Sequence, residues 1–224
     1  MYPAEFNNKT LILNNFKIFL DWIEGKQFII PKVEFYTGEI WHNEYGLEIL
    51  EIAYNSLKRW RWTGTIVIPS NCSFVLNETQ LNKIQRWINK FSKIGVYLCF
   101  SISVDGAIVE DEARPLNSKE SRTDEFYDRL FLFAKHNGYF FHPMVAASSI
   151  HKWIENFEWW KTMCNKYDMD VNKAVMMLEV RNNNWSEECI QKYCELLDYM
   201  IEDMKKCKCE NDNNIFFRRL FCLG

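Results

Sequence analysis

Short apolar runs alternate with amphipathic stretches from residue 32 onward. The runs begin near residues 33, 65, 97, 140 and 174. Apart from a longer interval between the third and fourth, their spacing is the thirty-odd residues typical of βα units. Their near-continuous hydrophobicity is typical of strands buried on both faces, as in a parallel sheet. The pattern therefore predicts an α/β fold with five parallel strands, the last two over 140–147 and 174–180.

Helical periodicity fills the segments between these strands. One helix is predicted from apolar residues at helical spacing, which are Leu47, Leu50, Tyr54 and Leu57. Another begins at about residue 78, because Asn77 is an N-cap residue and Gln80 follows it at capping-box spacing. Further helices are expected over 10–24, 124–136 and 150–165. A last helix is expected after Ser186, with a buried face of Ile190, Tyr193, Leu197, Met200 and Met204.

Polar residues follow the carboxyl ends of the first three predicted strands. They are Gly38 and Glu39 after the first, Ser70 and Asn71 after the second, and Ser103 and Asp105 after the third. Parallel strands bring their carboxyl ends to one edge, where α/β proteins bind their ligands. The sequence therefore predicts a small-molecule or cofactor site at this edge.

Length and charge narrow the class of protein. A chain of 224 residues with 48% hydrophobic content can bury the core of one α/β domain. Its net charge of −3 provides no basic surface for nucleic acid. The sequence contains no apolar stretch of membrane-spanning length, and residues 1–20 lack the charged start, apolar centre and cleavage site of a signal peptide. We therefore expect a cytoplasmic protein that binds neither nucleic acid nor a membrane.

The eight cysteines are scattered over predicted strands, helices and the tail. No Cys-x-x-Cys occurs, and Cys207 with Cys209 is the one close pair. We expect free thiols without a disulfide framework, and no metal site built from these cysteines alone. No metal is assigned to the histidines, which are His42, His136, His142 and His151.

The order of the strand-end motifs resembles the radical S-adenosylmethionine (radical SAM) superfamily. The motifs are Thr37-Gly38-Glu39, then Ile68-Pro69-Ser70-Asn71, then Ser101-Ile102-Ser103-Val104-Asp105-Gly106, followed by Arg114. Within the superfamily, the chain is most similar to the peptide- and protein-modifying branch with a SPASM extension and auxiliary iron–sulfur clusters. The resemblance covers residues 1–206, and residues 207–224 look like a linker and the start of that extension, with Cys222 a candidate auxiliary-cluster ligand.

This resemblance implies a partial (βα)6 TIM-like barrel of parallel strands, whose first strand is missing from this chain. It implies SAM and a [4Fe–4S] cluster as the cofactors of the full-length enzyme, and an electron donor such as flavodoxin or ferredoxin. The reduced cluster cleaves SAM, and the resulting 5′-deoxyadenosyl radical abstracts hydrogen from a peptide or protein substrate.

The chain also departs from the family pattern. It lacks the Cys-x3-Cys-x2-Cys loop that holds the cluster, and Thr37-Gly38-Glu39-Ile40 lacks one glycine and the proline of the Gly-Gly-Glu-Pro turn. Ser70-Asn71-Cys72 stands where the family has a Thr-Asn-Gly-like turn. We therefore expect the central portion of a longer enzyme, inactive by itself. The alternatives are a degenerate or truncated binding module without the cluster, and an unrelated α/β enzyme.

The candidate residues have competing interpretations. Glu39 suits the ammonium group of SAM, or it is a solvated acid at a helix start. Ser103 and Arg114 stand where the family contacts ribose and carboxylate. Asp105 with Gly106 binds cofactor or makes a turn. Arg181 contacts an anionic substrate group or forms a structural ion pair. The cluster of Trp153, Trp159 and Trp160 lines a peptide groove or packs in the core.

Overall fold

The computed structural model describes residues 8–26, 30–35, 46–110, 123–176, 179–180 and 185–206. The chain divides into two compact units. The first contains Met1–Ser70 and Asn77–Phe100, and the second contains Asn71–Leu76 and Ser101–Gly224. Each unit has its own buried side chains.

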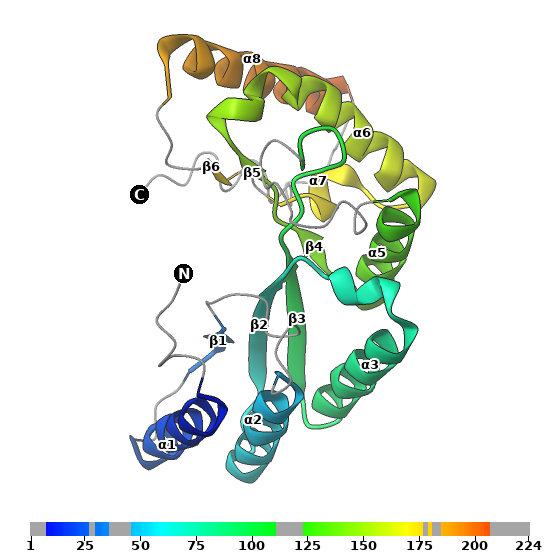
Figure 1. Ribbon diagram of the computed structural model, residues 1–224. Helices are drawn as coiled ribbons and strands as arrows, with labels where there is room; N and C mark the ends of the chain where they lie inside the picture. The colour runs from blue at the N-terminus through cyan, green and yellow to red at the C-terminus, as the bar shows by residue number, and fades with distance from the viewer. Residues whose placement is uncertain are drawn as a thin grey trace. The chain divides into compact units, whose positions relative to one another are not determined.

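The main sheet has four strands in the order β1-β2-β3-β4, which is also their order along the chain (Figure 1). These strands are β1 (Lys32–Glu34), β2 (Gly64–Ser70), β3 (Val96–Ile102) and β4 (Phe140–Phe141). β1 pairs with β2 in parallel, and the last two residues of β3 pair in parallel with β4. A second parallel pair joins β5 (Met144–Val145) to β6 (Glu179–Val180). The prediction of an α/β fold with parallel strands is confirmed.

The two later strands are shorter than predicted. The expected strand over 140–147 is divided into β4 and β5 at His142-Pro143, because proline has no N–H for a strand ladder. The strand predicted over 174–180 was placed to begin too early, because residue 174 is still helical. Ala174 ends the short helix α7 (Val171–Ala174), whose N-cap Asp170 accepts a hydrogen bond from the Asn172 N–H. Val175 then forms an isolated parallel bridge with Phe141.

Three helices belong to the first unit. They are α1 (Lys9–Lys26), α2 (Gly46–Trp60) and α3 (Glu78–Ser92), and α1 lies beside α2 in Figure 1. Arg59 near the end of α2 pairs with Asp21 and Glu24 near the end of α1. The predicted start of α3 is confirmed, since the Asn77 side chain accepts a hydrogen bond from the Gln80 N–H at 3.0 Å.

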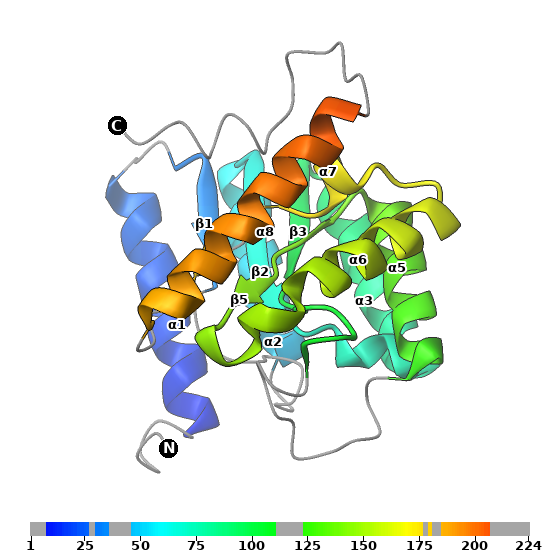
Figure 2. The same ribbon diagram turned by 90° about the horizontal axis from the view of Figure 1, so that it is seen from above.

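The second unit contains the remaining helical segments. They are η3 (Ser73–Leu76), α5 (Asp124–Asn137), η5 (Ala147–Lys152), α6 (Trp153–Lys166), α7 and α8 (Glu187–Lys206). The helix expected over 150–165 is therefore a 3-10 turn followed by α6. Figure 2 shows α8 running beside η5 and α6, and contacts join α8 to both. Within the described part of the chain, no helix has the length and apolar content needed to cross a membrane.

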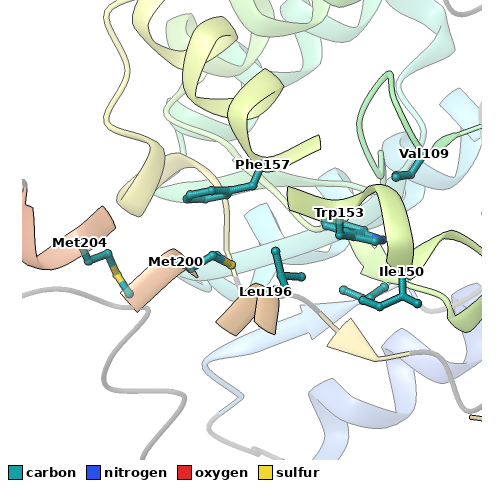
Figure 3. Close-up of a cluster of buried hydrophobic side chains, with 8 residues drawn as sticks. Val109, Ile150, Trp153, Phe157, Leu196, Met200 and Met204 are labelled. Carbon is teal, nitrogen blue, oxygen red and sulfur yellow. The ribbon is translucent and has the colours of Figure 1, made fainter. Parts of the chain in front are cut away.

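The core between α8, η5 and α6 is drawn in Figure 3. Leu196, Met200 and Met204 point from α8 toward Trp153 and Phe157 of α6. The prediction for Ile190 is wrong, because 51% of its surface is exposed. Met200 and Met204 are buried as predicted, while Leu196 is buried and the predicted Leu197 only partly so. Trp153 and Trp160 are fully buried, which favours the core interpretation of the tryptophan cluster.

An ion-pair network also joins α6 to α8. The Lys161 Nζ lies 2.5 Å from Asp203 Oδ1 and 3.0 Å from Glu158 Oε1. The hydrogen bond with Asp203 raises the pKa of Lys161 above its ordinary value of 10.5, against a lowering by burial. Because the folded pKa is the higher one, the network stabilises the fold fully below the unfolded pKa, and this contribution is lost as the pH rises through the folded value.

We therefore expect urea stability to decline above about pH 10 in the wild type and to decline less in Lys161→Met. At pH 7 the substitution is expected to cost about 1 kcal/mol, since the pair is only partly buried. Urea titrations of both proteins between pH 7 and pH 11 measure the difference, and parallel curves for the two would contradict it.

Candidate functional site

The nine candidate residues divide between described and undescribed parts of the chain. Five lie outside the described residues: Gly38, Glu39, Arg114, Arg181 and Cys222. The other four follow the carboxyl ends of two strands, as predicted. Ser70 ends β2 and Asn71 follows it, while Ser103 and Asp105 follow β3.

The turn after β2 is held by Asn71. Its Oδ1 accepts a hydrogen bond from the Ser73 N–H at 2.9 Å, which starts the η3 turn. Cys72 between them is fully buried and has a φ of 56°, in the left-handed region that glycine adopts most easily.

The effect of a substitution at Cys72 on stability should therefore depend on how easily the new residue adopts this backbone conformation. We expect Cys72→Gly to change the free energy of unfolding by less than about 1 kcal/mol, because relief of the left-handed conformation offsets the lost thiol contacts. Cys72→Val should cost about 3 kcal/mol, since a β-branched residue fits this φ poorly. Urea unfolding of both variants gives the comparison, and a more stable Val variant would contradict it.

The loop after β3, residues 103–110, is fixed by a buried carboxylate that sequence reasoning missed. Glu110 Oε2 accepts hydrogen bonds from the backbone N–H of Asp105 at 2.5 Å and of Gly106 at 3.1 Å. Only 2% of the Glu110 surface is exposed. The one signal in the sequence is an acid placed four residues after an Asp-Gly pair, at the distance needed to close such a loop.

Asp105 also accepts hydrogen bonds from β5 and from α6. Its Oδ1 accepts a hydrogen bond from the Met144 N–H at 2.7 Å, which ties the loop to β5. Its backbone oxygen accepts hydrogen bonds from Asn156 Nδ2 at 2.8 Å and from Trp160 Nε1 at 3.3 Å, both on α6. Asp105 is fully buried, so this geometry favours the turn interpretation over direct cofactor contact. Ser103, which is half-buried, is the better candidate for a ligand at this strand end.

A separate cavity of about 680 Å³ lies in the first unit. Its walls come from the last turns of α1 and α2 and from the residues that enter β1 and β2, and they include Ile23, Leu57, Trp60 and Trp62. This is the amino end of the strands, opposite to the predicted ligand edge. The sequence analysis did not anticipate it, although the Trp60-Arg61-Trp62 run next to a strand start was a visible signal.

The described residues do not fit an iron–sulfur cluster. No group of three His, Cys, Asp or Glu side chains among them is arranged to hold a metal ion. The five described cysteines are free thiols, and burial raises the pKa of Cys164 to about 12 and also raises that of Cys99. A cluster requires thiolates, so neither Cys99 nor Cys164 suits that role.

No protein-family model, curated protein or solved structure matches the chain.

Proposed function

We propose that this chain is the SAM-binding core of a radical SAM enzyme that modifies a peptide or protein. The observation that carries the proposal is the order of the strands in the main sheet. They follow one another as β1-β2-β3-β4, and the parallel bridge from Phe141 to Val175 continues the same direction. Polar residues stand after β2 and β3 at the edge that such a fold uses for ligands.

Strand order distinguishes two kinds of parallel α/β fold. Doubly wound sheets such as dinucleotide-binding domains reverse direction at a switch point, so consecutive strands are not all neighbours. A sheet wound in one direction is typical of (βα) barrels, because right-handed crossovers then place every helix on one face. The order observed here supports the partial (βα)6 barrel that the resemblance implies.

The residues that would hold SAM come from three strand ends. Glu39 would accept hydrogen bonds from the SAM ammonium group, and Ser103 would contact the ribose, with Arg114 beside the carboxylate. Ser70 and Asn71 would shape the turn that follows β2. SAM supplies the 5′-deoxyadenosyl group for hydrogen abstraction, while the protein orients SAM and the substrate and excludes water. Because the described residues do not fit the cluster, its ligands would come from residues other than those that the structure describes.

A titration with SAM tests the proposal. We expect weak but saturable binding to the wild-type chain, and Glu39→Gln should weaken it about tenfold through loss of a charged acceptor. Glu51→Gln is the matched control, since Glu51 is exposed on α2. Isothermal titration calorimetry measures all three proteins. Equal affinities in the three proteins, or no binding to any of them, would contradict the proposal.

Anaerobic reconstitution with iron and sulfide tests whether this chain can assemble the cluster by itself. We expect the 224-residue chain to retain fewer than four irons and to form no 5′-deoxyadenosine with SAM and dithionite. Four irons per chain with cleavage of SAM would show that its own cysteines suffice. The alternative function, a SAM-fold scaffold without chemistry, predicts the same SAM affinity but no activity even when the cluster loop is supplied on a longer chain.

A further inference from the structure

The cavity of about 680 Å³ in the first unit is lined on two sides by helices. Leu20 and Ile23 line it from α1, Leu57 and Trp60 from α2, and Val33 from β1. Because α1 and α2 lie side by side (Figure 1), the cavity lies between them and not at the outer edge of β1. Ligand pockets in proteins commonly have volumes of about 300 to 1,000 Å³, so this cavity is large enough for a small molecule.

The walls of this cavity are mostly apolar. They include the indole rings of Trp60 and Trp62, and the polar residues among them are Glu24, Arg61 and Thr63. The Trp62 Nε1 donates a hydrogen bond to Ile30 O at 2.6 Å, which fixes the turn after α2 against the residues that enter β1. A largely preformed apolar space with few polar groups is typical of a small-molecule site.

Arg61 is the cavity residue whose charge is not compensated. Glu24 pairs with Arg59, since Arg59 Nη2 lies 2.6 Å from Glu24 Oε2. Arg59 also pairs with Asp21, and Asp21 with Lys17, so this surface network contains two acids and two bases. Arg61 has no ion-pair partner in the part of the chain that the structure describes. Among the described lining residues, one charge is therefore uncompensated, and it is positive.

Arg61 also ends α2 in a conformation that favours glycine. Its φ is 53°, in the left-handed region. The Arg61 N–H donates to Lys58 O at 3.2 Å. The Trp62 N–H donates to Leu57 O at 3.1 Å. These two bonds form the Schellman motif, in which glycine is the usual residue at the left-handed position. Non-glycine residues held in this conformation cluster at functional sites, because another role outweighs the conformational cost.

We propose that this cavity binds a small carboxylate with an apolar body, and that Arg61 binds its carboxylate group. The guanidinium presents a planar pair of N–H donors, which matches the two oxygens of a carboxylate. A phosphate carries more charge, and the described walls offer no second uncompensated cation for it. The apolar body of the ligand would lie against Ile23, Leu57 and Trp60. This site is separate from the proposed SAM site, which lies at the opposite ends of the strands.

Calorimetric titration of the full chain with octanoate and with octan-1-ol tests this site, independently of any SAM binding. We expect octanoate to bind the wild type with a Kd of about 100 µM, and octan-1-ol to bind about tenfold more weakly because it has no carboxylate. Arg61→Gly should weaken octanoate binding about tenfold and leave the affinity for octan-1-ol unchanged. No binding of octanoate, equal affinities for the two ligands, or an unchanged octanoate affinity in Arg61→Gly would each overturn the proposal.

The same substitution should stabilise the fold. Glycine adopts the left-handed conformation without strain, so Arg61→Gly should raise the midpoint of urea unfolding. Weaker octanoate binding by a more stable protein cannot result from damage to the fold. Asp168→Gly is the matched control, since Asp168 has a φ of 50° in the second unit, and it should keep the wild-type octanoate affinity. A lower midpoint in Arg61→Gly, or weaker octanoate binding in Asp168→Gly, would contradict the role assigned to Arg61.

A second pair of variants tests the apolar part of the site. Ile23→Phe places a larger side chain in the cavity and should weaken the binding of octanoate and of octan-1-ol by about fivefold each. Ile18→Phe makes the same change on the same helix at a position that is 64% exposed, and it should leave both affinities within about twofold of wild type. Circular dichroism shows whether both variants keep the wild-type helix content. Equal effects of the two substitutions on octanoate binding would show that the ligand does not occupy this cavity.

Discussion

Substitution of Gly106 by alanine should destabilise the second unit by about 3 kcal/mol. Gly106 has a φ of 109°, which residues with a side chain rarely adopt. A Cβ at this position would lie 2.4 Å from Asn156 Oδ1. Asn156 is fully buried and donates to Asp105 O, so it has no room to retreat without breaking that bond.

Gly138 supplies a matched control for this substitution. Its φ is also positive, at 68°, but no atom lies within 4 Å of a Cβ built on it. Gly138→Ala should therefore cost about 1 kcal/mol, from backbone conformation alone. Urea unfolding of the two variants separates the steric collision from the conformational cost. Equal losses of stability would show that Asn156 does not crowd Gly106 as described.

Removal of the Glu110 carboxylate should have a similarly large effect. Glu110→Ala leaves the backbone N–H groups of Asp105 and Gly106 without their acceptor in a buried loop. Each hydrogen bond to a charged group contributes about 1.5 to 3 kcal/mol, so we expect a loss of about 3 kcal/mol in total after the gain from removing a buried charge.

Glu110→Gln distinguishes the hydrogen bonds from the volume of the side chain. The amide oxygen of glutamine can accept the same two bonds without a charge, so this variant should retain more than half of the stability lost in Glu110→Ala. Urea unfolding of both variants gives the comparison. If Glu110→Gln is as unstable as Glu110→Ala, the carboxylate has a role beyond accepting these two bonds.

Local signals in the sequence identified most elements of the fold. Elements with a local sequence signal were predicted correctly. These are the start of α3 at the Asn77 cap, the apolar face of α2, and the apolar runs of β2 and β3. The later strands were not, because Pro143 interrupts one ladder and the Asp170 cap extends a helix into the next apolar run. The buried face of α8 depends on packing against η5 and α6, which periodicity alone does not determine.

The strand-end positions of four candidate residues were predicted more accurately than their contacts. Strand order and polarity located Ser70, Asn71, Ser103 and Asp105 at strand ends. The role of Asp105 depends on Met144 and Asn156, which lie more than thirty residues further along the chain. Long-range hydrogen bonds of this kind leave no periodic trace in a sequence.

Hydrogen–deuterium exchange with and without SAM tests the central claim most directly, because it locates the ligand as well as detecting it. We expect slower exchange in the peptides that follow the first three strands, covering residues 36–45, 70–72 and 103–106. The cavity at the opposite edge, formed by Ile23, Trp60 and Trp62 among others, should be unaffected. Protection confined to that cavity, or no protection at any SAM concentration, would contradict a SAM site at the carboxyl ends of the strands.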